Sequence, residues 1–257
     1  MPTQNLRLLT YASTSPPADL SLEEAIQLGL EDATSPPTWR VWEARQHAVV
    51  LGTGQEAAKE VDLDAARAAG IPVLRRHSGG GAVLIGPGVI ACSGFYRIAE
   101  LPGATTISGA MRAALAPVRA ALKALGVDAR EVGLSDLAVP SADGSLRKLA
   151  GNAQARKRVS VLVHGTLLAD PDWELLERLL RFPSRPPEYR AGRGHRPFLT
   201  SLRELGAPCG LSAFVEALAS VLGPDWPRAA KPLETEALKA RELLAVKYSR
   251  DEWNLRR

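Results

Sequence analysis

Apolar residues recur along the chain at two spacings, one typical of helices and the other of strands. Leu20, Ala25, Ile26 and Leu28 have a helix-like spacing, and Ser21 followed three residues later by Glu24 is a capping box, so a helix is predicted over residues 20–30. The same periodicity predicts helices over residues 62–69, 108–125, 171–180, 212–222 and 234–248. Apolar runs bounded by turn residues predict strands over residues 39–44, 47–52, 71–74, 89–96, 136–139, 146–150 and 160–169. Residues 75–85 are predicted to form a strand, a glycine loop and a strand.

The order of these elements indicates the fold class. Strands follow one another across short turns, with few helices between them, which favours an α+β fold with a mixed, largely antiparallel β-sheet flanked by helices. A length of 257 residues fits a single domain. Residues 183–197 are rich in proline, arginine and glycine, which predicts a mobile or functional loop.

Composition narrows the functional classes. No window reaches the roughly 18 consecutive apolar residues of a membrane span, and residues 1–7 lack a secretory leader pattern, so a cytoplasmic location is expected. Cys92 and Cys209 are too few and too far apart for a disulfide framework or a cysteine-type zinc site. A net charge of +4 and 5% aromatic residues do not indicate nucleic-acid binding.

A glycine-rich stretch is the strongest chemical signal. Arg75 and Arg76 precede Ser78-Gly79-Gly80-Gly81-Ala82, whose side-chain-free residues expose backbone N–H groups to an anionic ligand. The stretch is not a phosphate-binding loop of the Walker type, because the Gly-Lys-Ser/Thr ending is missing and a strand follows instead of a helix. A simple bulge or turn is the alternative.

A lysine within a predicted strand is the second signal. Strand alternation places Lys148 on the face of Leu146 and Ala150, opposite Leu149. An ammonium fixed there could hold a phosphate or a developing acyl oxyanion, and the small residues Gly151 and Ala153 would leave room for the ligand. A solvent-exposed lysine on an edge strand is the more common situation.

Two further polar residues lie in predicted strands. His164 precedes Gly165 and Thr166, but a lone strand histidine is usually a satisfied core or surface residue. Asp136 begins a strand and could accept a hydrogen bond or bind Mg²⁺, although an aspartate there is commonly part of a turn. Each of these signals is weak by itself.

Taken together and in this order, the motifs resemble the lipoate-protein ligase A and lipoyl/octanoyl transferase family. The matching segments are Leu51-Gly52-x-Gly54-Gln55, Arg75-Arg76-x-Ser78-Gly79-Gly80-Gly81-Ala82-Val83, Ser135-Asp136-Leu137, Lys148-x-Ala150-Gly151-Asn152-Ala153-Gln154, His164-Gly165-Thr166-Leu167-Leu168 and Tyr248-Ser249-x-x-x-Trp253-Asn254. The resemblance implies the catalytic-domain fold of biotin and lipoate protein ligases, which is similar to that of class II synthetases.

The resemblance also implies roles for these residues. Lys148 would be catalytic, contacting the activated carboxyl group and the phosphate. The substrate and adenylate would be bound by Arg75, Arg76, Ser78, Gly79, Gly80, Gly81, Ala82, Asp136, Gly151, Asn152, Ala153, His164, Gly165 and Thr166. No resident metal is expected, and Mg²⁺ would arrive with ATP, near Asp136.

Several departures from the family pattern bear on the reaction. Transferases that form an acyl-thioester carry a cysteine just upstream of the lysine strand in one branch, but residues 131–146 contain none. Cys209 follows Thr200-Ser201-Leu202, whereas the cysteine of the other branch precedes such a segment, so its Pro-Cys-Gly context is a coincidence. Cys92 is interpreted as a buried strand thiol and a reserve nucleophile. Ile85 and Ser135 replace a histidine and an asparagine that are usual in the family.

The function predicted from the sequence is an ATP-dependent lipoate-protein ligase that activates lipoic acid or octanoate as its AMP ester. The acceptor is a lysine of a lipoyl-domain protein: a dehydrogenase E2 subunit, the glycine-cleavage H protein or a lipoate-binding protein. The chain ends where many ligases continue into an accessory domain, so a separate accessory-domain protein is a further expected partner; neither nucleic acid nor a membrane is expected. The alternatives are a cysteine-dependent transferase using an acyl carrier protein, and a non-catalytic lipoate- or lipoyl-domain-binding module.

Overall fold

A computed structural model describes residues 6–256, so most of the stretch considered for a leader, residues 1–5, lies outside the described part. Its centre is an eight-stranded sheet in the order β11-β1-β2-β6-β10-β9-β8-β7. These strands are β1 (Arg7–Leu9), β2 (Thr38–Glu43), β6 (Val89–Arg97), β7 (Arg130–Val132), β8 (Asp136–Pro140), β9 (Leu146–Arg156), β10 (Ser160–Leu168) and β11 (Arg228–Ala229). Strand β1 pairs in parallel with β2 and β11, and the other neighbours are antiparallel.

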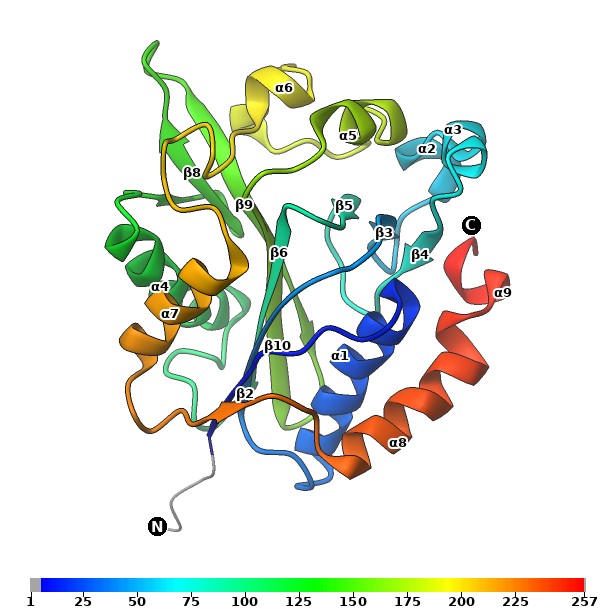
Figure 1. Cartoon of the computed structure of the whole chain (residues 1–257), viewed down its shortest axis with the longest axis vertical. Coiled ribbons are helices and arrows are strands. Elements are labelled where there is room, and N and C mark those ends of the chain that lie inside the picture. Colours follow the sequence, from blue (N-terminus) through cyan, green and yellow to red (C-terminus); the bar gives the residue numbers. More distant parts are fainter. Residues whose placement is uncertain (1–5, 257) are drawn as a thin grey trace.

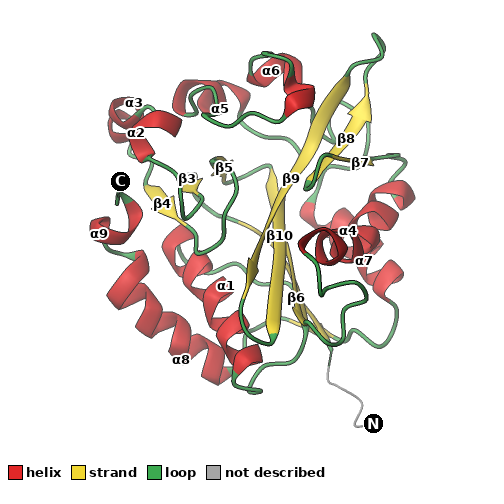
Figure 2. Ribbon diagram, turned by 180° about the vertical axis from the view of Figure 1, so that it is seen from behind, coloured by secondary structure: helices red, strands yellow, loops and turns green. Residues whose placement is uncertain are grey.

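A smaller sheet stands beside the large one. It has the order β4-β3-β5 and consists of β3 (Ala48–Leu51), β4 (Val73–Arg75) and β5 (Val83–Ile85). The helices are α1 (Pro16–Glu31), α2 (Ala57–Glu60), α3 (Leu63–Ala68), α4 (Ile107–Ala124), α5 (Trp173–Leu179), α6 (His195–Phe198), α7 (Leu211–Leu222), α8 (Glu234–Leu243) and α9 (Asp251–Asn254). Helices α1 and α8 cover one face of the large sheet, and α4 and α7 cover the other (Figures 1 and 2).

The predicted α+β class and mixed, largely antiparallel sheet are confirmed. The two strands predicted over residues 39–44 and 47–52 follow each other closely in the chain but belong to different sheets, β2 to the large one and β3 to the small one. Strands β1, β7 and β11 were missed, since two or three residues are too few to show a periodicity. Residues 183–197 are partly ordered by a 3₁₀ turn, Glu188–Arg190, and by the start of α6. The helix predicted to residue 248 ends in a π-helical turn, Leu244–Tyr248.

Alternation along β6 separates the two faces of the large sheet. Ile90 and Cys92 pack into the core cluster that includes residues of α4 and α7, whereas Phe95 packs with residues of α1. Ala91 and Ser93 share the Phe95 face, which therefore carries both polar and small side chains toward α1. Cys92 points away from that face.

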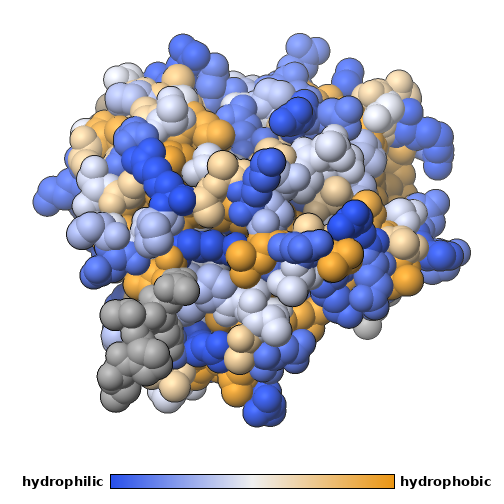
Figure 3. All heavy atoms as spheres, turned by 60° about the horizontal axis from the view of Figure 1, so that its bottom comes forward, coloured by the Kyte–Doolittle hydropathy of each residue, from blue (hydrophilic) through white to orange (hydrophobic). Residues whose placement is uncertain are grey.

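The outer surface has no dominant apolar area on the side that carries the described beginning of the chain. Figure 3 shows apolar residues in small groups among hydrophilic ones on that side. Within residues 6–256, none of the helices is long and apolar enough to cross a membrane.

Candidate functional site

A cavity of about 640 Å³ lies on the α1 face of the large sheet. Its walls come from the large sheet, from β5 and the glycine loop before it, and from residues 181–199. One part is apolar, and its walls include Leu20, Trp42, Val50, Val83, Ile85 and Ala91. The other part contains the charged side chains Glu60, Asp136, Lys148, Arg181, Arg185, Glu188 and Arg190. A cavity with one apolar end and one charged end suits an acyl chain that carries a polar head.

The floor of the cavity is a single cross-strand row. Trp42 pairs with Ala91, Ala91 with Thr166, Thr166 with Gly151, and Gly151 with Asp136. Three strand spacings separate Trp42 from Gly151, a distance of about 14 Å. Between the two lie only the small side chains of Ala91 and Thr166, so the row forms a trough. An extended chain of eight atoms has seven bonds, so at about 1.2 Å per bond it reaches about 8 Å and fits within this length.

A β-bulge brings Lys148 to the polar end of the trough. Leu137 pairs with Ala150 and the next residue, Ala138, pairs with Lys148, so Leu149 has no partner opposite it. Because paired residues share a face, the bulge moves Lys148 to the face opposite Ala150 and onto the face of Asp136. The predicted alternation is thus wrong for Ala150, although Lys148 does reach the cavity.

The Lys148 ammonium lies over Gly151 and is paired with Asp136. Its Nζ is 2.9 Å from Asp136 Oδ1, and Tyr189 donates from its hydroxyl to Asp136 Oδ2 at 2.9 Å. A Cβ on Gly151 would lie 2.6 Å from Lys148 Nζ, so glycine is required for the lysine to lie there. Burial and the neighbouring Asp136 charge raise the pKa of Tyr189 above its ordinary value, so its hydroxyl stays a donor at neutral pH.

Arg76 shapes the glycine loop from inside. Its guanidinium donates to the carbonyls of Gly79 and Gly81 at 2.6 and 2.8 Å and to that of Val50 at 3.2 Å. Burial lowers the pKa of Arg76 to about 10, which leaves it cationic at neutral pH. Within residues 6–256, no backbone carbonyl accepts a hydrogen bond from the N–H groups of Gly79, Gly80 and Gly81. These donors suit an anionic ligand.

Arg75 belongs to the support of the loop and not to the cavity wall. Its side chain is fully buried and donates to the carbonyls of Gly52 and Gln55 at 2.9 and 2.7 Å. It also donates to the carbonyls of Asn254 and Arg256 at 3.2 and 2.9 Å. The end of the chain is therefore joined to the base of the glycine loop.

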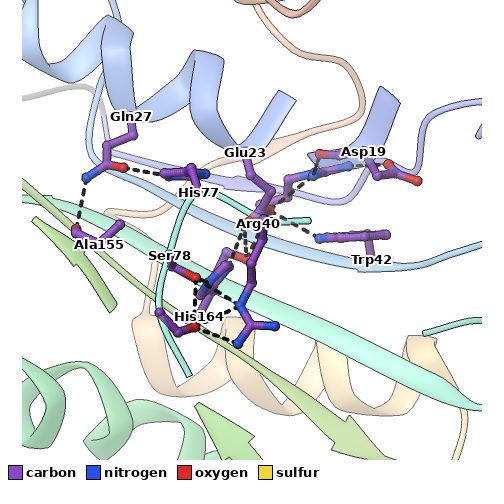
Figure 4. Close-up of polar contacts among 12 residues, drawn as sticks. Asp19, Glu23, Gln27, Arg40, Trp42, His77, Ser78, Ala155 and His164 are labelled. Carbon is purple, nitrogen blue, oxygen red and sulfur yellow. Dashed lines mark hydrogen bonds and ion pairs between the residues drawn. The ribbon is translucent and has the colours of Figure 1, made fainter. Parts of the chain in front are cut away.

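A polar stripe on α1 borders the apolar part of the cavity. Asp19, Glu23 and Gln27 are spaced four residues apart, so they share one helical face, and each is at most 2% exposed. Arg40 bonds to Asp19 and Glu23, as Figure 4 shows, and its guanidinium carbon lies 4.5 Å from the Trp42 ring centre. The stripe thus fixes the indole that ends the trough.

Glu23 is the centre of this network. It accepts hydrogen bonds from Arg40, Trp42, Ser93 and His164. Burial alone would raise the pKa of Glu23, but the bond from His164 and the Arg40 charge outweigh it and lower the pKa to about 2. An ionised carboxylate only accepts hydrogen bonds, so His164 Nδ1 carries a proton.

Ser78, His164 and Glu23 have the connectivity of a nucleophilic triad. Ser78 Oγ is 2.6 Å from His164 Nε2, and His164 Nδ1 is 3.1 Å from Glu23 Oε2 (Figure 4). However, Ser78 is 1% exposed, lies outside the cavity wall, and accepts a hydrogen bond from Arg76 Nε at 3.0 Å. The three residues therefore connect the polar stripe to the glycine loop, and Ser78 is too enclosed to attack a substrate.

The cavity brings most of the predicted site residues together. Its wall includes Arg76, Gly80, Gly81, Ala82, Asp136, Lys148, Gly151, Asn152, Ala153, His164, Gly165 and Thr166, but not Arg75, Ser78 or Gly79. Sequence reasoning missed Glu23 and Tyr189. Carboxylates and an amide at four-residue spacing within a helix that otherwise buries apolar residues could have indicated Glu23, whereas nothing local marked Tyr189.

Neither cysteine lies in the cavity wall. Cys92 packs on the opposite face of the sheet, where burial raises the pKa of its thiol above the ordinary value. Cys209 is half-buried just before α7 and packs beside the same core. Both are therefore unsuited as nucleophiles in this cavity.

Acidic side chains near Lys148 do not form a ready metal site. Within the described residues, no group of three or more His, Cys, Asp or Glu side chains could hold a metal ion. Both oxygens of Asp136 are engaged, one by Lys148 and the other by Tyr189. A Mg²⁺ ion that came with a nucleotide would have to share an oxygen of Asp136 with one of these donors or displace it.

Comparisons with known proteins agree with this geometry. Residues 15–223 match the family model of the lipoyl protein ligase A/B catalytic domain. The chain is 33% identical to the octanoyltransferase LipM of Kyrpidia tusciae, over 99% of this chain and 100% of the relative. A bi-partite lipoate protein ligase of Thermoplasma acidophilum superposes with a TM-score of 0.82 at 26% identity, covering 98% of this chain and 96% of that one. A lipoate-protein ligase A bound with ATP superposes with a TM-score of 0.80 at 26% identity, covering 98% of both chains.

Proposed function

Because the chain belongs to the lipoyl protein ligase A/B catalytic domain family, we propose that it transfers an octanoyl or lipoyl group to a lysine of a lipoyl-domain protein. The observation that carries this proposal is the trough from Trp42 to Gly151, with the Lys148 ammonium at its polar end. An apolar trough of this length accommodates an eight-carbon acyl group, and a fixed cation stabilises negative charge on the acyl oxygen or on a leaving phosphate.

The transfer step needs few groups from the protein. The acyl chain lies along Ala91 and Thr166, which places its carbonyl over Gly151 and beside Lys148. The neutral amine of the acceptor lysine attacks this carbonyl, the new C–N bond forms, and the bond to the leaving group breaks. The proton lost by the attacking nitrogen passes to the leaving group or to water. Catalysis is then mainly orientation and charge stabilisation.

The next question is which activated acyl compound serves as the donor. The names of the full-length relatives, octanoyltransferases at 33% and 32% identity, favour the transferase alternative over the ATP-dependent ligase predicted from the sequence. The exclusion of Cys92 and Cys209 from the cavity wall argues against a cysteine-bound intermediate. We therefore propose direct attack of the acceptor lysine on an activated acyl group held by Lys148, with acyl-AMP formed from ATP as the donor.

The second candidate is an octanoyltransferase that takes the acyl group from an acyl carrier protein, and the names of those relatives favour it. In the cysteine-dependent form, Cys92 or Cys209 would carry the acyl group as a thioester. Reaching Cys92 would require the large sheet to open, because the thiol lies on the face packed against the α4 and α7 core.

Intact-mass spectrometry of a purified lipoyl domain tests these readings. The domain is incubated with the protein and one of three donors: Mg-ATP with lipoic acid, synthetic octanoyl-AMP, or octanoyl-acyl carrier protein. We expect a mass shift with octanoyl-AMP, and a shift with Mg-ATP would add the activation step. A shift with octanoyl-AMP alone would assign activation to a separate accessory protein.

A shift only with the carrier protein, abolished in a Cys92→Ser or Cys209→Ser variant, would overturn the proposed donor. A hydroxylamine-sensitive mass adduct on the protein would accompany that result. Binding of lipoic acid without transfer from any donor would overturn the enzymatic function and favour a binding module. Lys148→Ala and the exposed-lysine variant Lys123→Ala serve as the matched pair, and only the first should lose transfer.

A further inference from the structure

The arginine-rich segment (residues 181–198) follows α5, lines the cavity and ends beside the backbone of Lys148. Directly after it, Thr200 donates from its backbone N–H to the Lys148 carbonyl at 2.9 Å, and Leu199 forms a parallel bridge with Lys148. The side chain of Arg147 donates to the Leu199 carbonyl. The backbone of the proposed catalytic lysine is therefore fixed by the end of this segment.

The same segment also contacts the lysine's counter-ion. Tyr189 donates to Asp136 Oδ2, while Lys148 Nζ lies 2.9 Å from the other oxygen, Oδ1. The Tyr189 ring packs on Phe198 at 5.1 Å, and Arg193 donates to the Tyr189 carbonyl at 2.8 Å. These contacts fix the phenol, and Asp136 is held between two donors from different parts of the chain.

From this geometry we propose that Tyr189 is a positioning residue, which acts through Asp136 to keep the Lys148 ammonium over Gly151. The inference rests on the proposed function for its catalytic consequence. The hydrogen bond from Tyr189 to one oxygen restrains rotation of the carboxylate, so its other oxygen sets where the ammonium lies. The acyl chain is bound elsewhere, along the apolar trough, so loss of the phenol hydroxyl lowers the rate of transfer more than donor binding.

The kinetic test uses Tyr189→Phe, which keeps the ring against Phe198 and removes only the hydroxyl. Acyl transfer from octanoyl-AMP to a lipoyl domain is expected to lose about tenfold in kcat, as for a hydrogen bond to a charged group, with KM within about twofold. Tyr96→Phe, which removes a hydroxyl on the opposite face of the sheet, is the control. A rise in KM at unchanged kcat would overturn the proposal and make Tyr189 part of a closing segment.

A double-mutant cycle tests whether the effect passes through Asp136. In an Asp136→Asn background, Tyr189→Phe is expected to cause no further loss of kcat. Full additivity of the two losses would overturn the proposal.

A second readout does not depend on transfer. The protein has seven lysines, and an amine-reactive ester followed by peptide mass spectrometry gives the labelling rate of each. In the parent protein, Tyr189→Phe is expected to change the labelling rate of Lys148 at least twofold. In the Asp136→Asn background it is expected to leave that rate unchanged. The labelling rates of the other six lysines should stay constant in all variants. If no donor supports transfer but this pattern is found, the proposed function fails and the positioning role stands. If Lys148 is labelled alike in all variants, the positioning role fails, whatever the reaction proves to be.

Discussion

Trp42 closes the apolar end of the cavity from within a six-residue strand, whereas Lys148 reaches the polar end through one bulged residue, Leu149. At the first end, strand register and the buried Arg40 and Glu23 side chains hold the indole in one place. At the polar end, the bulge at Leu149, the glycine at position 151 and the arginine-rich segment together determine where the Lys148 ammonium lies. The comparison teaches that strand register sets the shape of the trough, whereas the position of the charge at its end depends on contacts from a distant segment of the chain.

Removal of the charge should have the largest effect. Lys148→Ala is expected to lower the rate of acyl transfer by about a thousandfold, at the upper end of what a single electrostatic group contributes. The acyl chain should still bind, because the trough is unchanged. Single-turnover transfer and fluorescence titration with an octanoyl ligand measure the two quantities. Equal losses in both would show that the two ends of the cavity do not act separately.

A fall in pH should weaken the buried Glu23 network that holds Trp42 at the apolar end of the trough. The pKa of Glu23 is about 2 in the folded protein, against an ordinary value of 4.5, so its stabilising effect is complete above pH 4.5 and is lost as the pH falls toward 2. The free energy of unfolding should drop by at most about 3 kcal/mol across this window, because the unfolded chain binds one more proton. Urea unfolding at several pH values measures it.

Glu23→Gln should remove the contribution of Glu23 to the pH dependence of the unfolding free energy. Glu242→Gln, at an exposed position, should leave that pH dependence unchanged. Parallel curves for the parent and Glu23→Gln would mean that other groups dominate acid unfolding.

A methyl group added at Gly151, next to the Lys148 ammonium, should also reduce the rate of transfer strongly. Gly151→Ala places a Cβ 2.6 Å from Lys148 Nζ, so the flexible side chain must move off its position. We expect transfer to fall by about thirtyfold with little change in melting temperature, since a 1 Å displacement at a reacting centre is costly in rate. Gly210→Ala, whose Cβ would meet no atom closer than 3.9 Å, is the matched control. Unchanged transfer in Gly151→Ala would show that the ammonium is not needed over this residue.

Removing the Trp42 side chain from the apolar end of the trough should change the selectivity between acyl chains more than the rate of transfer. Trp42→Ala lengthens the trough, so the preference between octanoyl and dodecanoyl donors is expected to shift by about tenfold or more toward the longer chain, since one methylene in an apolar pocket is already worth about tenfold. Ala91→Val, which narrows the middle of the trough, should shift preference toward hexanoyl donors. Competition between donors, read by the mass of the product, checks both. A preference for octanoyl that survives in both variants would place the acyl chain outside the trough.

Local sequence patterns predicted the long helices and strands, because those elements repeat their apolar positions over several turns or residue pairs. They also led to the glycine loop and to Lys148. They failed at Leu149, since a bulge is set by the pairing of two strands and leaves no mark in the alternation of one. Lys148 was therefore predicted to reach the cavity for a reason that is partly wrong.

The parts of the site that were missed depend on distant contacts. Glu23 meets His164 across 141 positions of the chain, and Tyr189 meets Asp136 across 53. A pattern within a short window cannot show which distant residues become neighbours. Arg75 illustrates the converse error: it lies in a ligand-binding motif, yet its buried guanidinium binds backbone carbonyls of the loop and of the chain's end.

These bonds of Arg75 also order events during synthesis. Its partners at the end of the chain, Asn254 and Arg256, follow it by 179 and 181 residues. At a translation rate of about 5–20 residues per second, the ribosome needs roughly 10–40 s to add them. Until those residues are added, the Arg75 guanidinium lacks these acceptors, so the base of the glycine loop is then held by the bonds from Arg75 to Gly52 and Gln55.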